Sequence, residues 1–202
     1  MISLDLETLI HKQRDFLTNE PIIAVSISYF KDSINTELFV AKNDSKEEEE
    51  NILIKSGNFV SSLEPAIIIG YNHTGYDVPL LQMKLKSHSV FSQLYKFKYY
   101  LATSYVLDMM YVVADYLYSY DGDYRLRKLS EVVSHEAFSG LDLDRKKNLV
   151  IKEGKGVGEV IEDLWKSGSN DFIDYIRGDT RDILKIFLRL FSQEISSQHS
   201  TP

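Results

Sequence analysis

Two carboxylates stand two residues apart at the start of the chain. Asp5 and Glu7 alternate with apolar residues, as on a strand that has one polar and one apolar face. The apolar face consists of Ile2, Leu4 and Leu6. Like charges so close raise each other's pKa, whereas a divalent cation reverses the sign of their interaction. An exposed acidic pair is the alternative, but the apolar face indicates a core strand, so we interpret the pair as a metal site.

A third carboxylate interrupts the apolar stripe of the last predicted helix. It is Asp179, and the stripe consists of Phe172, Ile176, Ile183, Phe187 and Leu190. Tyr175 lies one turn before Asp179, so its hydroxyl and the carboxylate share a side of the helix. A tyrosine hydrogen-bonded to an aspartate at the surface is the alternative. Asp174 and Asp182 fall outside the stripe and are interpreted as solvated charges, and Gly178 as a local kink.

Asp77 follows the uniformly apolar run 66–70, which is typical of a strand buried on both faces. Ligands collect at the carboxyl ends of such strands in α/β sheets. A helix N-cap, or the N3 partner of Thr74 in a capping box, would explain Asp77 equally well. The same loop holds Tyr71 and Asn72, which could contact a nucleotide. Local sequence therefore leaves both a ligand role and a structural role open for Asp77.

The elements that must position these residues indicate an α/β domain. Strands are expected over 2–7, 22–30, 36–40, 66–70 and 105–109. Helices are expected over 45–63, 76–86, 110–117, 126–133, 157–165 and 171–191. Ser45 is the predicted N-cap of the first helix, and Asp108 is interpreted as a cap or as a supporting residue beside the site. Strands followed by alternating helices and strands predict a mixed sheet with helices on its faces.

Length and composition predict one domain over 1–195 and a polar tail over 196–202, with an irregular excursion over 139–158. No stretch approaches about 18 consecutive apolar residues and no signal peptide is evident, so a soluble, cytoplasmic protein without membrane contact is expected. The chain has no cysteine, which restricts any metal to oxygen or imidazole ligands.

The net charge of −7 has the wrong sign for gripping nucleic acid by bulk electrostatics. Part of the acidity is local, at 47–50, which we interpret as a solvated helix start. Positive charge is clustered in two places. One cluster is Lys84, Lys86, Lys96 and Lys98, interleaved with Tyr95, Tyr99 and Tyr100, and the other is Arg125, Arg127 and Lys128.

Three motifs occur in a fixed order along the chain. Residues 4–8 have the form D-x-E-T, residues 70–81 the form G-Y-N-x-x-x-[FY]-D-x-P-x-L, and residues 175–179 the form Y-x-x-x-D. In these motifs the chain resembles the proofreading exonuclease domain of family B DNA polymerases, within the DEDD (DnaQ-like) exonucleases. The second motif is highly specific, and the tyrosine of the third is that of the DEDDy subgroup.

The resemblance implies a ribonuclease H-like fold, a five-stranded mixed sheet flanked by helices. It also implies two divalent cations, Mg²⁺ or Mn²⁺, which oxygen-only ligation favours. Their implied ligands are Asp5, Glu7, Asp77 and Asp179. Tyr175 would orient the attacking water. The 3′ terminus would be held around Thr8, Tyr71, Asn72 and Tyr76.

The implied activity is 3′-5′ exonuclease cleavage of DNA, with single-stranded or frayed ends preferred and RNA as an alternative substrate. The resemblance runs from Ile2 to about Leu190, so an exonuclease without a polymerase domain is expected. A replication or repair protein is a candidate partner. A ribonuclease or junction endonuclease of the same fold, and a non-catalytic nucleic-acid-binding module, are the alternatives. Sequence does not decide the oligomeric state.

Overall fold

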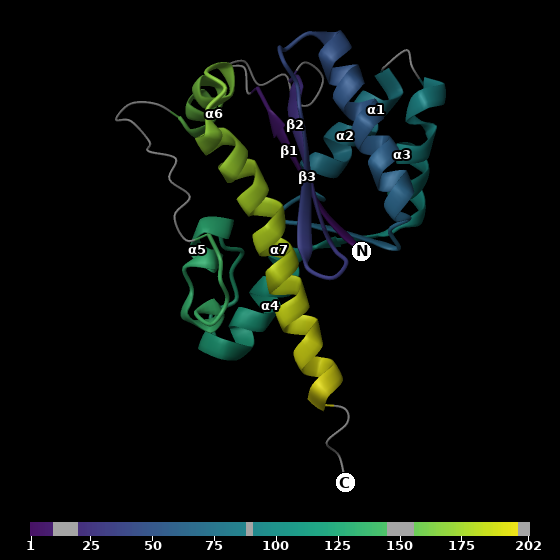
Figure 1. Cartoon of the computed structure of the whole chain (residues 1–202). Coiled ribbons are helices and arrows are strands. Elements are labelled where there is room, and N and C mark those ends of the chain that lie inside the picture. The colour runs from purple at the N-terminus through teal and green to yellow at the C-terminus, as the bar shows by residue number, and fades with distance from the viewer. Residues whose placement is uncertain (10–19, 88–90, 145–155, 198–202) are drawn as a thin grey trace.

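A five-stranded sheet forms the centre of the computed structural model, which describes residues 1–9, 20–87, 91–144 and 156–197 (Figure 1). The strands are β1 (Ile2–Thr8), β2 (Ile22–Phe30), β3 (Ile34–Val40), β4 (Ile67–Gly70) and β5 (Tyr105–Asp108). They lie in the order β3-β2-β1-β4-β5. The first three strands pair antiparallel, whereas β4 and β5 join in parallel. The predicted mixed α/β sheet is confirmed.

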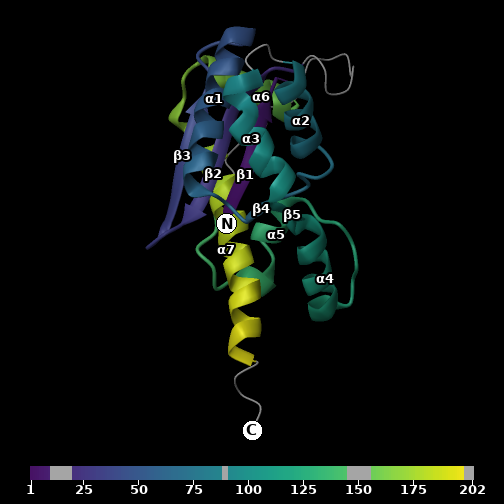
Figure 2. The same cartoon turned by 90° about the vertical axis from the view of Figure 1, so that its right-hand side faces the viewer.

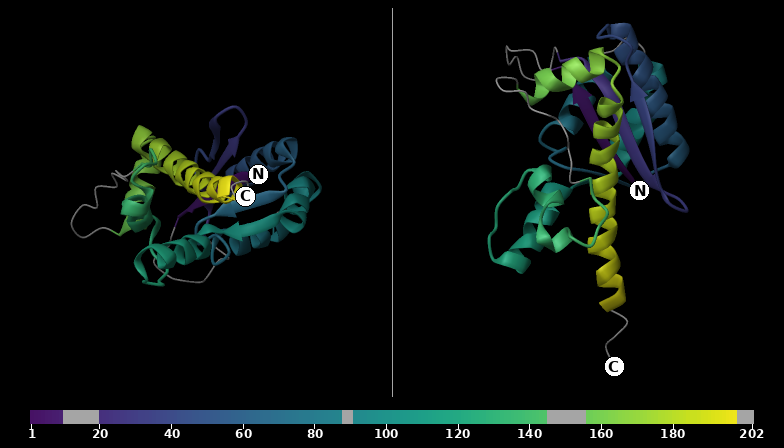
Figure 3. Two further views of the ribbon diagram at one scale, coloured as in Figure 1. Left: turned by 90° about the horizontal axis from the view of Figure 1, so that it is seen from below. Right: turned by 60° about the vertical axis from the view of Figure 1, so that its left-hand side comes forward.

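Helices cover both faces of this sheet. The helices α1 (Lys46–Leu63), α2 (Asp77–Ser87) and α3 (Phe91–Thr103) pack together on one side (Figure 2). On the other side the long helix α7 (Asn170–Ser197) crosses β1, β2 and β3 (Figure 1). The helices α4 (Met109–Asp121) and α5 (Leu129–Val133) stand beside α7, and α6 (Val157–Lys166) lies at its N-terminal end (Figure 3). In the described part of the chain, no helix has both the length and the apolar character of a membrane span.

The central strand β1 has two chemically different faces. Ile2 and Leu4 are fully buried and pack with apolar residues of α1, α2 and α3. Asp5 pairs with Ser26 of β2 across the sheet, so both residues lie on the opposite face, the one that α7 covers. There the Ser26 hydroxyl lies 2.8 Å from that of Thr180 on α7. The alternation predicted for β1 therefore turns its carboxylates toward the last helix.

The strands agree with the sequence predictions to within about two residues, whereas the helices differ more. Ser45 caps α1 as predicted, accepting a hydrogen bond from the Glu48 N–H. The helix α3 was not predicted, because its lysines and tyrosines obscured the buried stripe of Leu94, Phe97 and Leu101. The predicted helix over 126–133 begins only at Leu129. Most of the predicted excursion and of the predicted tail, 145–155 and 198–202, lies outside the described residues.

A carboxylate predicted to be solvated forms a buried ion pair instead. The Glu49 carboxylate lies 2.8 Å from Lys84 Nζ and also accepts the Ile22 N–H at 2.8 Å. Both side chains are less than a tenth exposed. Glu49 was assigned to a solvated helix start, and that prediction is wrong. Lys84, which was named only as part of a cluster of positive charge, is the partner of Glu49. The sequence could not show that α1 turns this glutamate inward, where the lysine of α2 and the start of β2 meet it.

Candidate metal centre

Three of the four predicted carboxylates come together where β1 faces α7. Carboxylate oxygens of Asp5, Glu7 and Asp179 all lie within 4.8 Å of one another. The strand sets the first two apart on one face, and α7 carries the third into the sheet, where Asp179 is only 8% exposed. Asp5 is half-buried. The prediction that Asp179 interrupts a buried stripe is confirmed by the burial of Ile176 and Ile183 on either side of it.

The chemistry of this donor set suits a hard divalent cation. Three carboxylates at such a separation repel one another, and a cation among them removes the repulsion. Oxygen ligands are those that Mg²⁺ and Mn²⁺ prefer, and the chain has no cysteine to favour a softer metal. The cluster Asp5, Glu7 and Asp179 could therefore hold a metal ion.

The fourth predicted carboxylate, Asp77, lies beside this cluster and not within it. Its Oδ1 accepts the backbone N–H of Leu6 at 3.3 Å, so a residue between the two carboxylates of β1 holds it in place. Burial raises the pKa of Asp77 to about 7, helped by the negative charges of Asp108 and Asp179 and opposed by its backbone hydrogen bonds. Asp77 is the first residue of α2, so the alternative of an N-cap does not describe it.

The predicted tyrosine lies against the acidic cluster. Burial raises the pKa of the Tyr175 hydroxyl far above its ordinary value, and the charges of Glu7, Asp179 and Asp5 raise it further. A hydrogen bond to Asp179 acts in the same direction. The hydroxyl therefore keeps its proton and acts as a hydrogen-bond donor beside the carboxylates.

Asp108 organises the loop between β4 and α2. Its carboxylate accepts the N–H groups of Asn72 at 2.8 Å and Thr74 at 3.1 Å, and the Thr74 hydroxyl at 2.6 Å. It also caps α4 by accepting the Met110 N–H. The prediction of a cap is confirmed, while the capping box between Thr74 and Asp77 is wrong because the Thr74 hydroxyl is engaged by Asp108.

The residues predicted to bind substrate surround the same loop. The Tyr71 hydroxyl donates to the Arg127 carbonyl at 2.6 Å. The Tyr76 hydroxyl lies 2.9 Å from that of Thr8 and contacts the Glu20 carboxylate. Asn72 is exposed and has a left-handed backbone, with φ of 58°. Both tyrosine hydroxyls thus make hydrogen bonds within the protein, and both rings pack partly against the core, so only the exposed part of each ring is available to a ligand.

Gly70 allows this loop to close over a buried histidine. A Cβ added at Gly70 would lie 2.2 Å from His73 Nδ1, far inside van der Waals contact. The His73 ring is fully buried, and that burial lowers its pKa. The histidine is therefore a neutral packing element beneath the loop, consistent with the absence of metal-ligand spacing around it in the sequence.

A cavity of about 200 Å³ adjoins the acidic cluster. Its walls include Asp5, Tyr175 and Asp179 on one side and Tyr71 and Leu129 on the other. Ser3 and Thr180 also line it. Sequence reasoning missed Ser3, although its spacing of two from Asp5 on a strand was a usable signal.

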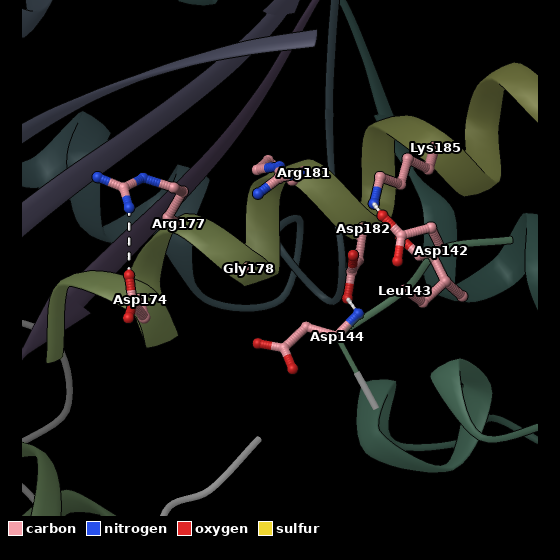
Figure 4. Close-up of a pocket in the computed structure, with 9 residues that line it drawn as sticks. All are labelled: Asp142, Leu143, Asp144, Asp174, Arg177, Gly178, Arg181, Asp182 and Lys185. Atoms are coloured by element: carbon pink, nitrogen blue, oxygen red, sulfur yellow. Dashed lines mark hydrogen bonds and ion pairs between the residues drawn. The ribbon is translucent and has the colours of Figure 1, made fainter. Parts of the chain in front are cut away.

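A larger hollow of about 370 Å³ lies beside α7, but its charges largely satisfy one another (Figure 4). Arg177 pairs with Asp174 at 3.2 Å, and Lys185 contacts Asp142. It holds none of the clustered carboxylates, so we place the candidate site at the smaller cavity.

One prediction about α7 is corrected in this hollow. Asp182 is only 1% exposed and accepts the Asp144 N–H at 2.9 Å, so its assignment as a solvated charge is wrong, whereas Asp174 is exposed as predicted. Residues 141–144 return to α7 and bury Asp182, which the helix pattern alone could not reveal. The helix continues through Gly178, where an added Cβ would lie 3.3 Å from the Asp144 carboxylate. Close approach of that carboxylate accounts for the glycine.

A scan against protein-family models gave no match, and a search of curated protein sequences gave none either. Among solved structures, the chain is similar to the family B DNA polymerase from the hyperthermophilic archaeon Pyrobaculum calidifontis, with a TM-score of 0.65 and 17% sequence identity. The match covers 94% of this chain and 24% of the polymerase chain. It supports the predicted α/β, ribonuclease H-like fold.

Proposed function

We propose that this chain is a 3′-5′ exonuclease that removes nucleotides from single-stranded or frayed 3′ ends of DNA with two divalent cations. The observation that carries the proposal is the approach of carboxylate oxygens of Asp5, Glu7 and Asp179 to within 4.8 Å of one another, in a cavity that Tyr175 also lines. The likeness to a polymerase chain supports the fold on which such a site would be built. The motif order in the sequence supports the specific activity.

The four carboxylates divide naturally between two cations. Asp5, Glu7 and Asp179 would hold the first, and Asp77 would complete a site for the second with Asp5. When bound, such cations stabilise charge on the phosphate and provide hydroxide near neutral pH. Without them, burial and neighbouring charge favour the protonated form of Asp77, because both raise its pKa.

Tyr175 contributes a hydrogen bond and not a base. Because its pKa is raised, the hydroxyl retains its proton across the physiological range and can only donate to, or orient, the attacking water. Its contacts with the cluster fix that donor in the cavity that Asp5 and Asp179 line. Tyr175 would therefore orient the attacking water, while the carboxylates would hold the cations.

Tyr71, Tyr76, Thr8 and Asn72 are proposed to hold the 3′-terminal nucleotide. Because the two tyrosine hydroxyls are engaged internally, their rings would act by stacking, which tolerates any base. Such contacts suit an unpaired end, since a base in a duplex has no free face.

A 5′-labelled single-stranded oligonucleotide incubated with Mn²⁺ tests the proposal. A descending ladder is expected for the wild type, and none for Asp179→Asn. Asp174→Asn on the same helix is the matched control, because that carboxylate is exposed and pairs with Arg177. A single internal cut would indicate the endonuclease alternative, and full activity of Asp179→Asn would refute the assignment. An RNA oligonucleotide in parallel decides the sugar preference.

A further inference from the structure

The end of α4 and the connection to α5 expose a group of large side chains. We call residues 118–128 the tyrosine track. Tyr118, Tyr120 and Tyr124 are 53%, 52% and 54% exposed, and Leu126 is 48% exposed. The rings of Tyr118 and Tyr124 meet edge to face, with centroids 6.2 Å apart. The Tyr120 ring meets that of His135 in the same way at 5.8 Å. About half of each tyrosine stays exposed, so a planar ligand could stack on the faces that these contacts leave uncovered.

The track is anchored from its inner side. Arg127 is only 5% exposed, and its guanidinium lies 2.8 Å from the Asp121 carboxylate and 3.5 Å from that of Asp123. Its carbonyl accepts the Tyr71 hydroxyl. This buried residue therefore helps to fix the path of the connection from its inner side.

The track leads to the candidate metal centre. The helix α4 leaves the sheet at Asp108 and, at 1.5 Å per residue, its 13 residues carry the chain about 20 Å away. The connection then returns outside the helix to α5 (Figure 2). Leu129, the first residue of α5 and the next after the track, lines the same cavity as Asp5 and Asp179. A strand lying along it would span about six nucleotides at the 3.4 Å spacing of a stacked strand, and fewer when extended.

The charge of the track is opposite to that of the whole chain. Residues 118–128 contain two acidic and three basic residues, whereas the chain carries −7. Arg127 and His135 engage the Asp121 carboxylate. Arg125 pairs with the carboxylates of Asp123 at 3.1 Å and Glu131 at 3.6 Å, but its side chain is 58% exposed, and Lys128 is also exposed. Open aromatic faces beside exposed basic groups are what unpaired bases and their phosphates require.

We infer that the tyrosine track binds single-stranded nucleic acid on the 5′ side of the residue being removed, with bases stacked on Tyr118, Tyr120 and Tyr124 and phosphates held by Arg125 and Lys128. The inference rests on the proposed function for the direction of the strand. The track would thus retain the strand between successive cleavages, which an acidic protein otherwise does poorly.

The test measures binding and cleavage separately. Affinity for a fluorescent 16-nucleotide oligothymidylate is measured in EDTA, where no cleavage occurs. The variant Tyr118→Ala/Tyr124→Ala/Arg125→Gln should bind at least about tenfold more weakly, because each stacked base contributes substantially to affinity. Phenylalanine at both tyrosine positions should retain the affinity, since stacking needs only the ring. Unchanged binding by the triple variant would overturn the inference.

A matched control comes from α3, which also exposes two tyrosines. Tyr95→Ala/Tyr99→Ala removes rings that are 58% and 48% exposed, and Lys96→Gln completes the match to the track variant. This control should bind the oligonucleotide like the wild type. If it loses as much affinity as the track variant, binding does not depend on the position of the exposed rings, which would contradict the inference. Failure of the wild type to bind the oligonucleotide would also refute the inference.

A small substrate distinguishes failure of this inference from failure of the proposed function. Mn²⁺-dependent hydrolysis of the p-nitrophenyl ester of thymidine 5′-monophosphate needs only the metal centre, so the track variant should keep its rate while its KM for the oligonucleotide rises about tenfold. Loss of both activities with a normal Tm would place the track residues in the metal centre and refute a separate role. If the wild type binds the oligonucleotide in EDTA but hydrolyses neither substrate with Mn²⁺, the binding role of the track is supported and the proposed exonuclease function is refuted.

Discussion

Replacement of Asp77 by asparagine should stabilise the metal-free protein above neutral pH. The folded state raises the pKa of Asp77 to about 7 from an ordinary 3.8. Between these values the folded chain holds a proton that the unfolded chain has lost. The free energy of unfolding therefore falls as pH rises from about 4 to about 7, and the full cost is present above pH 7.

The magnitude follows from the size of the shift. The difference between 3.8 and about 7 corresponds to about 4 kcal/mol of unfavourable free energy once Asp77 is ionised. Asparagine removes that cost and keeps an oxygen for the Leu6 N–H, although a neutral acceptor weakens the bond by about 1 kcal/mol. A net gain of about 3 kcal/mol is expected, which is on the order of 10 °C in Tm for a chain of this size.

Thermal unfolding in EDTA from pH 4 to pH 8.5 measures this effect. The variant should lack the wild type's decline between pH 4 and pH 7 and should unfold at higher temperature at pH 8. Asp174→Asn, at an exposed carboxylate, should change the free energy of unfolding by no more than about 0.5 kcal/mol. An Asp77→Asn protein no more stable than the wild type at pH 8 would refute the reasoning. Saturating Mn²⁺ should favour the wild type instead, because only its carboxylate gains from the cation.

Three further changes test other parts of the structure. Tyr175→Phe should lower kcat by about tenfold to a hundredfold, which is the value of a hydrogen bond to a charged group. It should leave the pH profile of kcat below pH 10 unchanged, because the raised pKa keeps the Tyr175 hydroxyl protonated. Thr180→Val should lower the free energy of unfolding by about 2 kcal/mol, since it removes a partner of the buried hydroxyls of Ser26 and Ser28 on β2; chemical denaturation measures this. Gly70→Ala should cost about 1–3 kcal/mol through overpacking against His73, whereas Gly140→Ala, with open space around it, should be neutral in the same assay.

Sequence periodicity was sufficient for the sheet and for three of the four carboxylates. A strand alternates with a period of two whatever its partners, so the two faces of β1 could be predicted before its neighbours were known. The same holds for Asp179, because a carboxylate inside an apolar stripe must be buried with that stripe. These predictions depend only on local geometry.

The predictions that failed depend on contacts between distant segments. Glu49 and Lys84 are separated by 35 positions and meet only because α1 and α2 pack on the same face. Asp182 is buried by a segment 38 residues earlier. The place of Asp77 is of the same kind, since it depends on an N–H of β1 that is 71 residues away. No periodic pattern carries information about such pairs.

Because the residues of β1 alternate between two faces, the candidate metal centre can form only when the strand pairs in the correct register. A slip of one residue against β2 or β4 would exchange the faces of the strand and drive Asp5 and Glu7 into the apolar layer under α1. A chain with that wrong strand pairing would lack the cluster of three carboxylates, so divalent cations would not bind to it and stabilise it. Divalent cations present during refolding should therefore stabilise only the correctly paired chain. The yield of refolded native protein should then rise with the concentration of these cations.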